Sequence, residues 1–89
     1  MCGIMGIISQ DLLPDLLFEE AIKASKFTQH RGPDNFGYWK NTSSLIMHHK
    51  LSILDLSERS NQPIHKRDVI LSFNGEIYNW KKLIKQFNL

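Results

Sequence analysis

Apolar residues along this chain gather in short runs and one helical stretch, with polar turns between them. Residues 3–9 (GIMGIIS) form an apolar run bounded by turn-like residues, which predicts a buried strand. From Pro14 to about His30, apolar and small residues recur at helical spacing, and acidic residues precede basic ones, which predicts an amphipathic helix. One face of this helix is formed by Leu17, Ala21, Ala24 and Thr28, with Phe18, Ile22 and Ser25 beside it.

The rest of the chain alternates turns with β-prone segments. Residues 30–37 (HRGPDNFG) predict a loop, and residues 37–40 and 45–49 predict two strands joined by a polar turn at 41–44. A polar stretch at 55–63 precedes the β-prone run 69–73 (VILSF). Asn79 is the expected cap of a last helix that carries Trp80, Leu83, Ile84 and Phe87. The order strand, helix, several strands, helix predicts an α+β layered domain.

Composition narrows the class of protein. At 89 residues the chain forms at most one domain, and its 42% hydrophobic and 22% charged residues are ordinary for a globular protein. The net charge is +2 and the basic residues are scattered, so no nucleic-acid partner is predicted. No apolar run reaches the length of a membrane span, and no signal peptide is recognisable. The single cysteine excludes an internal disulfide and favours the cytoplasm.

Cys2 is the first candidate for chemistry. The initiator methionine is normally removed before a small residue, so the mature chain can begin with the cysteine itself. Its α-amine, which can be unprotonated near neutral pH, would then lie beside its own thiol as a base. That is the arrangement of N-terminal-nucleophile enzymes. The alternative is a small hydrophobic residue at the start of a strand, and position alone favours this alternative.

Asn74 and Gly75 have two interpretations. Asn-Gly between apolar segments is a strong signal for a β-hairpin. The functional alternative is an oxyanion hole, in which the Asn side-chain amide and the Gly backbone N–H both donate to a developing negative charge. Glycine would suit that role because the backbone must approach closely and can adopt an unusual φ.

Other polar residues give weaker signals. The histidines at 30, 48, 49 and 65 match no zinc spacing, so surface or strand-packed histidines are favoured and no metal is expected. Lys50 can pair with a substrate carboxylate. Arg31 and Asp34 bracket a Gly-Pro turn, where they form either a local ion pair or a contact close to substrate.

Taken in order, five segments resemble class II glutamine amidotransferases. Within that class they resemble the N-terminal portion of the glutaminase domain of glutamine-dependent asparagine synthetases. The segments are residues 1–4 (MCGI), 30–34 (HRGPD), 48–53 (HHKLSI), 62–63 (QP) and 73–79 (FNGEIYN), and residues 1–89 would all belong to that portion. The resemblance implies a partial four-layer αββα N-terminal-nucleophile hydrolase sandwich with antiparallel sheets.

The resemblance also implies roles for individual residues. Cys2 would attack the side-chain amide of L-glutamine after removal of Met1, and Asn74 and Gly75 would stabilise the oxyanion. Lys50 would bind the substrate carboxylate, and Glu76 would help to hold the substrate amino group. The pocket would be lined by Leu51, Ser52, Ile53 and Leu54. Hydrolysis would give glutamate and ammonia, which the family normally feeds to an ATP-dependent asparagine synthetase domain. No cofactor is expected in this segment, since ATP and magnesium belong to that other domain.

Two departures from the family affect these expectations. The family has arginine at the position of Lys50, and a lysine cannot grip a carboxylate with two parallel donors, so weaker glutamine binding is expected. The chain also ends ten residues after the last motif, before the Gly-Ser-Asp segment that the family uses for the substrate amine. Little glutaminase activity is therefore expected from the isolated chain. Whether it acts as an enzyme or is an inactive remnant or partner-binding module stays open. Its open sheet edges would need the rest of the domain or another chain to cover them.

Overall fold

The computed structural model describes residues 2–52 and 60–89, which form two antiparallel sheets, two α-helices and one 3₁₀ helix. The predicted α+β class is confirmed. The elements in chain order are β1 (Gly3–Ile8), α1 (Asp15–Ser25), the 3₁₀ helix η1 (Lys26–Arg31), β2 (Asn35–Lys40), β3 (Ser44–Lys50), β4 (Ile64–Lys66), β5 (Val69–Leu71) and α2 (Trp80–Phe87).

The larger sheet has the strand order β1-β3-β2, with β3 in the centre. The polar turn at 41–44 folds β2 back on β3, as predicted, and pairs Lys40 with Leu45. β1 runs antiparallel to the other side of β3, with Gly3 opposite His49 and Ile8 opposite Ser44. This register places the start of β1, and therefore Cys2, beside the end of β3.

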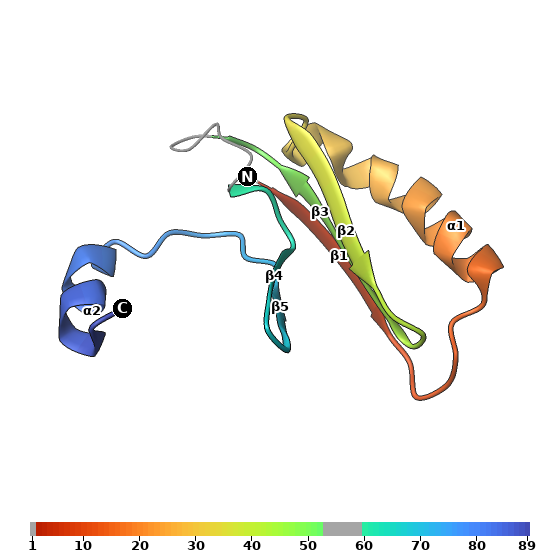
Figure 1. Ribbon diagram of the computed structural model, residues 1–89. Helices are drawn as coiled ribbons and strands as arrows, with labels where there is room; N and C mark the ends of the chain where they lie inside the picture. The colour runs from red at the N-terminus through yellow and green to blue at the C-terminus, as the bar shows by residue number, and fades with distance from the viewer. Residues whose placement is uncertain (1, 53–59) are drawn as a thin grey trace.

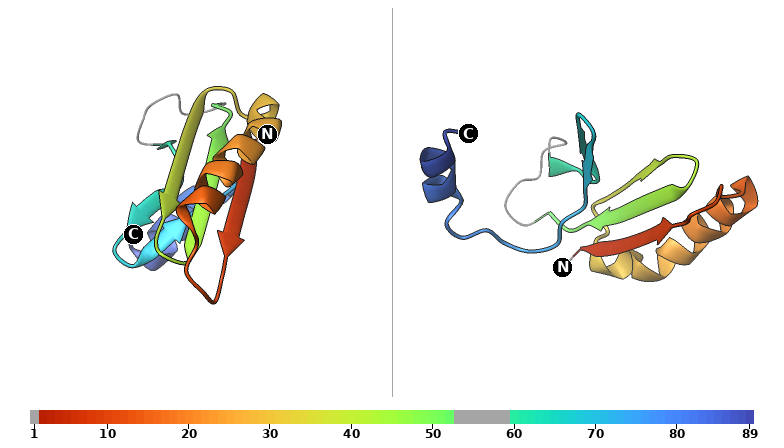
Figure 2. Two further views of the ribbon diagram at one scale, coloured as in Figure 1. Left: turned by 90° about the vertical axis from the view of Figure 1, so that its right-hand side faces the viewer. Right: turned by 90° about the horizontal axis from the view of Figure 1, so that it is seen from below.

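α1 packs against one face of this sheet (Figure 1; Figure 2). Ala21, Leu45 and Met47 form the buried core between them. The buried row of the helix is Phe18, Ala21, Ile22 and Ser25, whereas Leu17 and Ala24 of the expected face are exposed. Both rows have helical spacing, so the docking of the helix on β3 decided which one faces the core.

The second face of the sheet meets the β4–β5 hairpin, which lies on the side opposite α1 in Figure 1. Gly37 of β2 packs against the Gln62 carbonyl so closely that a Cβ there would lie 2.3 Å from the oxygen. The Trp39 and His65 rings are 6.2 Å apart, edge to face. The hairpin covers this face only in part, since Ile8 of β1 remains 85% exposed. The strand predicted at 3–9 is present as β1, but only one of its faces is covered.

The tight hairpin of the chain is at Arg67 and Asp68, because Lys66 of β4 pairs with Val69 of β5. Arg67 has φ 55°, a left-handed backbone conformation that residues other than glycine seldom adopt. Asn74-Gly75, the expected hairpin signal, instead lies in the connection between β5 and α2. The sequence analysis did not predict the β4–β5 hairpin, because Arg-Asp is not a typical turn pair.

α2 lies apart from the rest of the molecule at the end of an extended connection (Figure 1). Asn79 occupies the N-cap position but makes no side-chain capping hydrogen bond, which corrects the expected cap. The helix ends at Asn88, whose left-handed backbone lets the N–H of Leu89 reach the Ile84 carbonyl. Neither helix in the described part of the chain is long and apolar enough to cross a membrane.

Candidate active site

Cys2 lies directly before β1, where the backbone of Leu51 holds its sulfur. The N–H of Leu51 lies 3.3 Å from Cys2 Sγ, and the thiol lies 3.9 Å from the Leu51 carbonyl oxygen. Leu51 immediately follows β3, so the pairing of β1 with β3 creates this contact. The half-buried sulfur is thereby fixed at the edge of the sheet rather than packed in its core.

Asn74 reaches Cys2 from the other end of the chain. The backbone N of Cys2 donates to Asn74 Oδ1 at 3.2 Å, a contact across 72 positions of sequence. A backbone N–H can only donate, so the Asn74 amide must present its oxygen to Cys2 and keep its Nδ2 as a separate donor. Gly75 follows in exposed backbone, and its φ is not positive, so the expected unusual conformation was wrong.

The RGPD loop (residues 31–34) fastens this region together. Arg31 Nε donates to the Cys2 carbonyl at 3.1 Å. The backbone N of Asp34 donates to the Lys50 carbonyl at 2.9 Å, and Asp34 Oδ2 accepts from the Ser52 N–H at 2.6 Å. Arg31 and Asp34 do not pair with each other, so the first of the two alternatives, a local ion pair, was wrong. Instead, Arg31 holds Cys2, and Asp34 holds the backbone of Lys50 and Ser52, on either side of Leu51.

Gly32 allows the RGPD loop to lie directly on β3. A Cβ at this position would lie 2.0 Å from the His49 carbonyl oxygen and 2.7 Å from the Lys50 carbonyl carbon. Both atoms are backbone, which cannot move aside as a flexible side chain can. The close approach therefore requires glycine for lack of a side chain rather than for an unusual φ.

The predicted substrate-binding residues have different surroundings. Lys50 is 5% exposed, and its Nζ donates to Asn61 Oδ1 at 2.9 Å. Leu51 and Ser52 lie beside Cys2 and Asp34 through the contacts above, while the predicted pocket positions 53 and 54 lie outside the described residues. Glu76 is exposed, and no hydrogen bond or ion pair ties its carboxylate to any described residue.

His48 and His49 are both buried, on opposite faces of β3. His48 Nδ1 lies 2.6 Å from Ser72 Oγ on the hairpin side, and His49 Nε2 lies 3.4 Å from Ser25 Oγ on the α1 side. Burial, and after it the adjacent His49, lower the pKa of His48 below 6.5. Because neighbouring strand residues point to opposite faces, the two rings cannot share a metal ion. Across residues 2–52 and 60–89, no group of three side chains is placed to hold one.

The sequence analysis gave no role to two supporting residues, Gln62 and Ser72. Gln62 Oε1 accepts from the Phe73 N–H at 2.6 Å, and Ser72 contacts His48. Gln62 belongs to one of the five matching segments and Ser72 directly precedes another, which was a usable signal, but the partners that they contact lie on distant segments.

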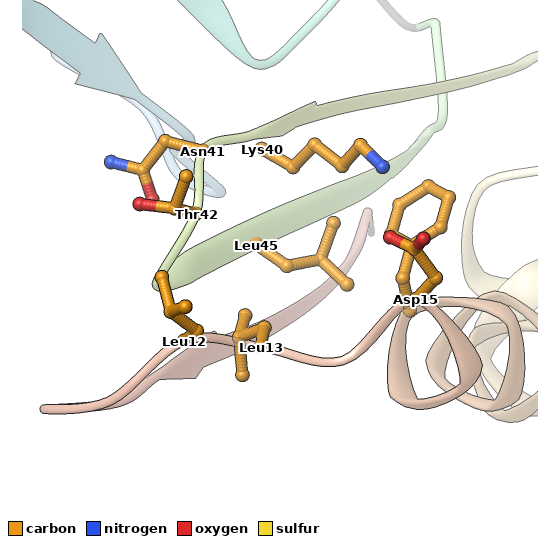
Figure 3. Close-up of a pocket in the computed structure, with 8 residues that line it drawn as sticks. Leu12, Leu13, Asp15, Lys40, Asn41, Thr42 and Leu45 are labelled. Atoms are coloured by element: carbon orange, nitrogen blue, oxygen red, sulfur yellow. The ribbon is translucent and has the colours of Figure 1, made fainter.

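A cavity of about 390 Å³ lies at the opposite end of the larger sheet from Cys2 (Figure 3). Its lining comes from the start of α1, the segment before it and the β2–β3 turn, namely Leu12, Leu13, Asp15, Phe18, Lys40, Asn41, Thr42 and Leu45. None of the predicted site residues belongs to this cavity. Cys2 and the residues that contact it are therefore separate from this cavity.

Comparison with known proteins gives a consistent assignment. The model of the glutamine amidotransferase domain family matches residues 1–89. A Methanocaldococcus jannaschii protein, provisionally named asparagine synthetase [glutamine-hydrolyzing] 2, is 38% identical over 109 residues, covering 100% of this chain and 21% of the relative. Asparagine synthetase B [glutamine-hydrolyzing] of Escherichia coli is 33% identical, with 98% of this chain and 16% of the relative covered. Asparagine synthetase [glutamine-hydrolyzing] 1 of Arabidopsis thaliana is 30% identical, with 97% and 15% covered. No solved structure matches the chain.

Proposed function

This chain belongs to the glutamine amidotransferase domain family, of the asparagine synthetase type, and we propose that it hydrolyses L-glutamine with Cys2 as nucleophile. The observation that supports this most directly is the meeting of three distant segments at Cys2. Leu51 contacts its sulfur, Asn74 contacts its nitrogen and Arg31 contacts its carbonyl. A cysteine that served only as a strand residue would not need all three.

The proton chemistry follows from the N-terminal position. Removal of Met1 turns the Cys2 nitrogen into an α-amine, which can still donate one N–H to Asn74 Oδ1, at 3.2 Å in the structure. Its lone pair accepts the thiol proton, and the resulting thiolate attacks the side-chain carbonyl carbon of glutamine. Asn74 therefore orients the base through its oxygen.

The amide nitrogen of the same side chain has the second role. Asn74 Nδ2 and the Gly75 N–H donate to the oxyanion of the tetrahedral intermediate. Collapse of the intermediate breaks the C–N bond, and the α-ammonium protonates the departing nitrogen, which leaves as ammonia. Water then attacks the thioester with the α-amine as base, the C–S bond breaks and glutamate is released.

The substrate is held by the segment that follows β3. Lys50 pairs with the α-carboxylate of glutamine, Leu51 and Ser52 line the pocket, and Glu76 receives the α-ammonium group. The contact of Leu51 with the Cys2 sulfur, and of Ser52 with Asp34 in the neighbouring loop, supports this arrangement. The exposure of Glu76 means that substrate, rather than the free protein, would fix its carboxylate.

The chain spans between 15% and 21% of the length of the relatives described above, whose names state asparagine synthesis from glutamine. We propose that the ammonia passes to an ATP-dependent asparagine synthetase domain, where ATP and magnesium would bind. In this proposal α1, the larger sheet and the β4–β5 hairpin would form successive layers of a partial αββα sandwich, which the two antiparallel sheets and the helix on one side support. The rest of the domain, or another chain, would cover the open side of that sandwich. A reducing compartment such as the cytoplasm suits the free thiol.

A catalytically inactive, partner-binding module is the second candidate. The observation in its favour is the uncovered apolar side of α2, where Trp80, Ile84 and Phe87 are 52%, 42% and 62% exposed. Such a module would use Cys2 for packing alone and would not require its amine to be free.

Labelling of Cys2 distinguishes the two candidates. The protein purified from cells is reacted with an electrophilic glutamine analogue that carries a γ-diazoketone, and intact mass spectrometry measures the labelled fraction. We expect one added group at Cys2, no labelling of Cys2→Ser and slow labelling of a form that keeps a residue before Cys2. Equal labelling rates with and without the blocked amine, or no preference over a diazoketone without the amino-acid group, would reject the glutaminase assignment.

A further inference from the structure

We infer that His48 is a positioning residue, which fixes the Asn74 segment against the sheet through its hydrogen bond to Ser72. The inference rests on the proposed function, because the group that it positions is the oxyanion donor and amine acceptor of that reaction. His48 itself does not touch Cys2 or the substrate. It acts through the backbone between Ser72 and Asn74.

Three consecutive residues of this segment each have an anchor on a different part of the chain. Ser72 Oγ lies 2.6 Å from His48 Nδ1, and the Phe73 N–H donates to Gln62 Oε1 at 2.6 Å. Asn74 Oδ1 then accepts from the Cys2 nitrogen at 3.2 Å. The segment between β5 and α2 has no strand pairing of its own, so these side-chain contacts determine where Asn74 lies.

Of the three residues that anchor this segment, His48 is the one whose side chain is fully buried. The imidazole is completely buried, and among the described residues its Nε2 has no hydrogen-bond partner. Leaving an N–H without an acceptor is less tolerable than leaving an acceptor without a donor. The proton therefore belongs on Nδ1, which donates to Ser72 Oγ. A donor fixed in a close-packed strand holds Ser72 at one distance from the sheet.

The electrostatic surroundings keep this ring neutral. Ser72 and Gly37, the neighbours on the hairpin and β2 sides, carry no charge. His49 is adjacent and Lys50 lies on the same face of β3, and both of these residues are bases. Protonation of His48 would place a second N–H, on the unpartnered Nε2, in a buried position beside these groups.

His49 provides a matched comparison. It is also a histidine of β3, it is 5% exposed and it contacts a serine, Ser25, through one ring nitrogen. It faces α1 rather than the hairpin, and no contact links it to the Asn74 segment. A purely structural effect of losing a buried histidine should therefore be similar at both positions, whereas a positioning effect should appear only at His48.

The test measures how fast the γ-diazoketone analogue labels Cys2 in the parent chain and in Ser72→Ala, His48→Leu, His48→Asn and His49→Leu. Each protein gives a maximal labelling rate and a half-saturating concentration of the analogue. The rate of Cys2 with iodoacetamide, which needs no oxyanion donor, corrects for accessibility, and circular dichroism confirms folding. We expect Ser72→Ala and His48→Leu to lower the maximal rate roughly 10- to 100-fold, since ~1 Å of misplacement costs about 100-fold. His48→Asn, which keeps a donor near the position of Nδ1, and His49→Leu should stay within about threefold of the parent.

A second readout does not depend on turnover. The side-chain NH₂ signals of Asn74 in the nitrogen-15 spectrum should move in Ser72→Ala and His48→Leu and stay in place in His49→Leu. Unchanged Asn74 signals, or an equal loss of rate in the His48 and His49 variants, would overturn the inference. A parent chain that the analogue fails to label would reject the proposed function, while movement of the Asn74 signals would still support the positioning role.

Discussion

Gly32→Ala tests how the RGPD loop organises the site. The added methyl would lie 2.0 Å from the His49 carbonyl oxygen, whereas ordinary contact begins at 3.4 Å. The loop and β3 must therefore separate by about 1.4 Å, the difference between these two distances. A rearrangement of this size in backbone cannot be absorbed by a change of rotamer.

Three hydrogen bonds depend on the close approach. They are Asp34 N to Lys50 O, Ser52 N to Asp34 Oδ2, and Arg31 Nε to the Cys2 carbonyl. At a net value of about 1 kcal/mol each, their loss lowers the free energy of unfolding by roughly 3 kcal/mol. The total stability of a domain of 89 residues is only about 4–13 kcal/mol, so the variant should be much less stable.

Urea unfolding followed by circular dichroism measures this change, with Gly6→Ala as the matched control. A Cβ at Gly6 would lie 3.5 Å from the Leu45 carbonyl oxygen, which is ordinary contact. We expect the unfolding midpoint of Gly32→Ala to fall by about 2 M and that of Gly6→Ala to change by less than about 0.5 M. Equal midpoints for the two variants would refute the argument that the loop must lie directly on β3.

Three further outcomes are expected. Arg31→Met removes the donor to the Cys2 carbonyl at 3.1 Å and should slow analogue labelling roughly 3- to 10-fold, while Arg67→Met leaves the rate unchanged. The lowered pKa of His48 means that the unfolded chain takes up its proton first, so the free energy of unfolding falls as pH drops below 6.5. In urea titrations His48→Leu should lose this part of the pH dependence. Lys50→Arg supplies two parallel donors to a carboxylate and should lower the half-saturating analogue concentration several-fold; an unchanged value would argue against carboxylate binding at Lys50.

The sequence by itself determined the local elements and the candidate chemistry. The apolar run before Ser9, the helical spacing after Pro14 and the polar turn at 41–44 predicted the first strand, the helix and the central hairpin. These elements form through contacts between near neighbours, which periodicity and turn residues reflect directly. The motifs around Cys2 and Asn74 also identified the family.

The tertiary structure decided which of two possible contacts each residue makes. Local spacing allowed either row of α1 to be buried, and docking on Leu45 and Met47 selected the row with Phe18 and Ser25 over the row with Leu17 and Ala24. Arg31 had an oppositely charged neighbour in the sequence but contacts Cys2 instead.

The bond between His48 and Ser72 has the same origin, since it joins positions 24 residues apart, and the contact from Cys2 to Asn74 joins positions 72 apart. Such contacts depend on how the sheet, the hairpin and the loop approach one another in space. No pattern of neighbouring residues carries that information, because a hydrogen bond has a range of about 3 Å and the chain can bring many different partners within it.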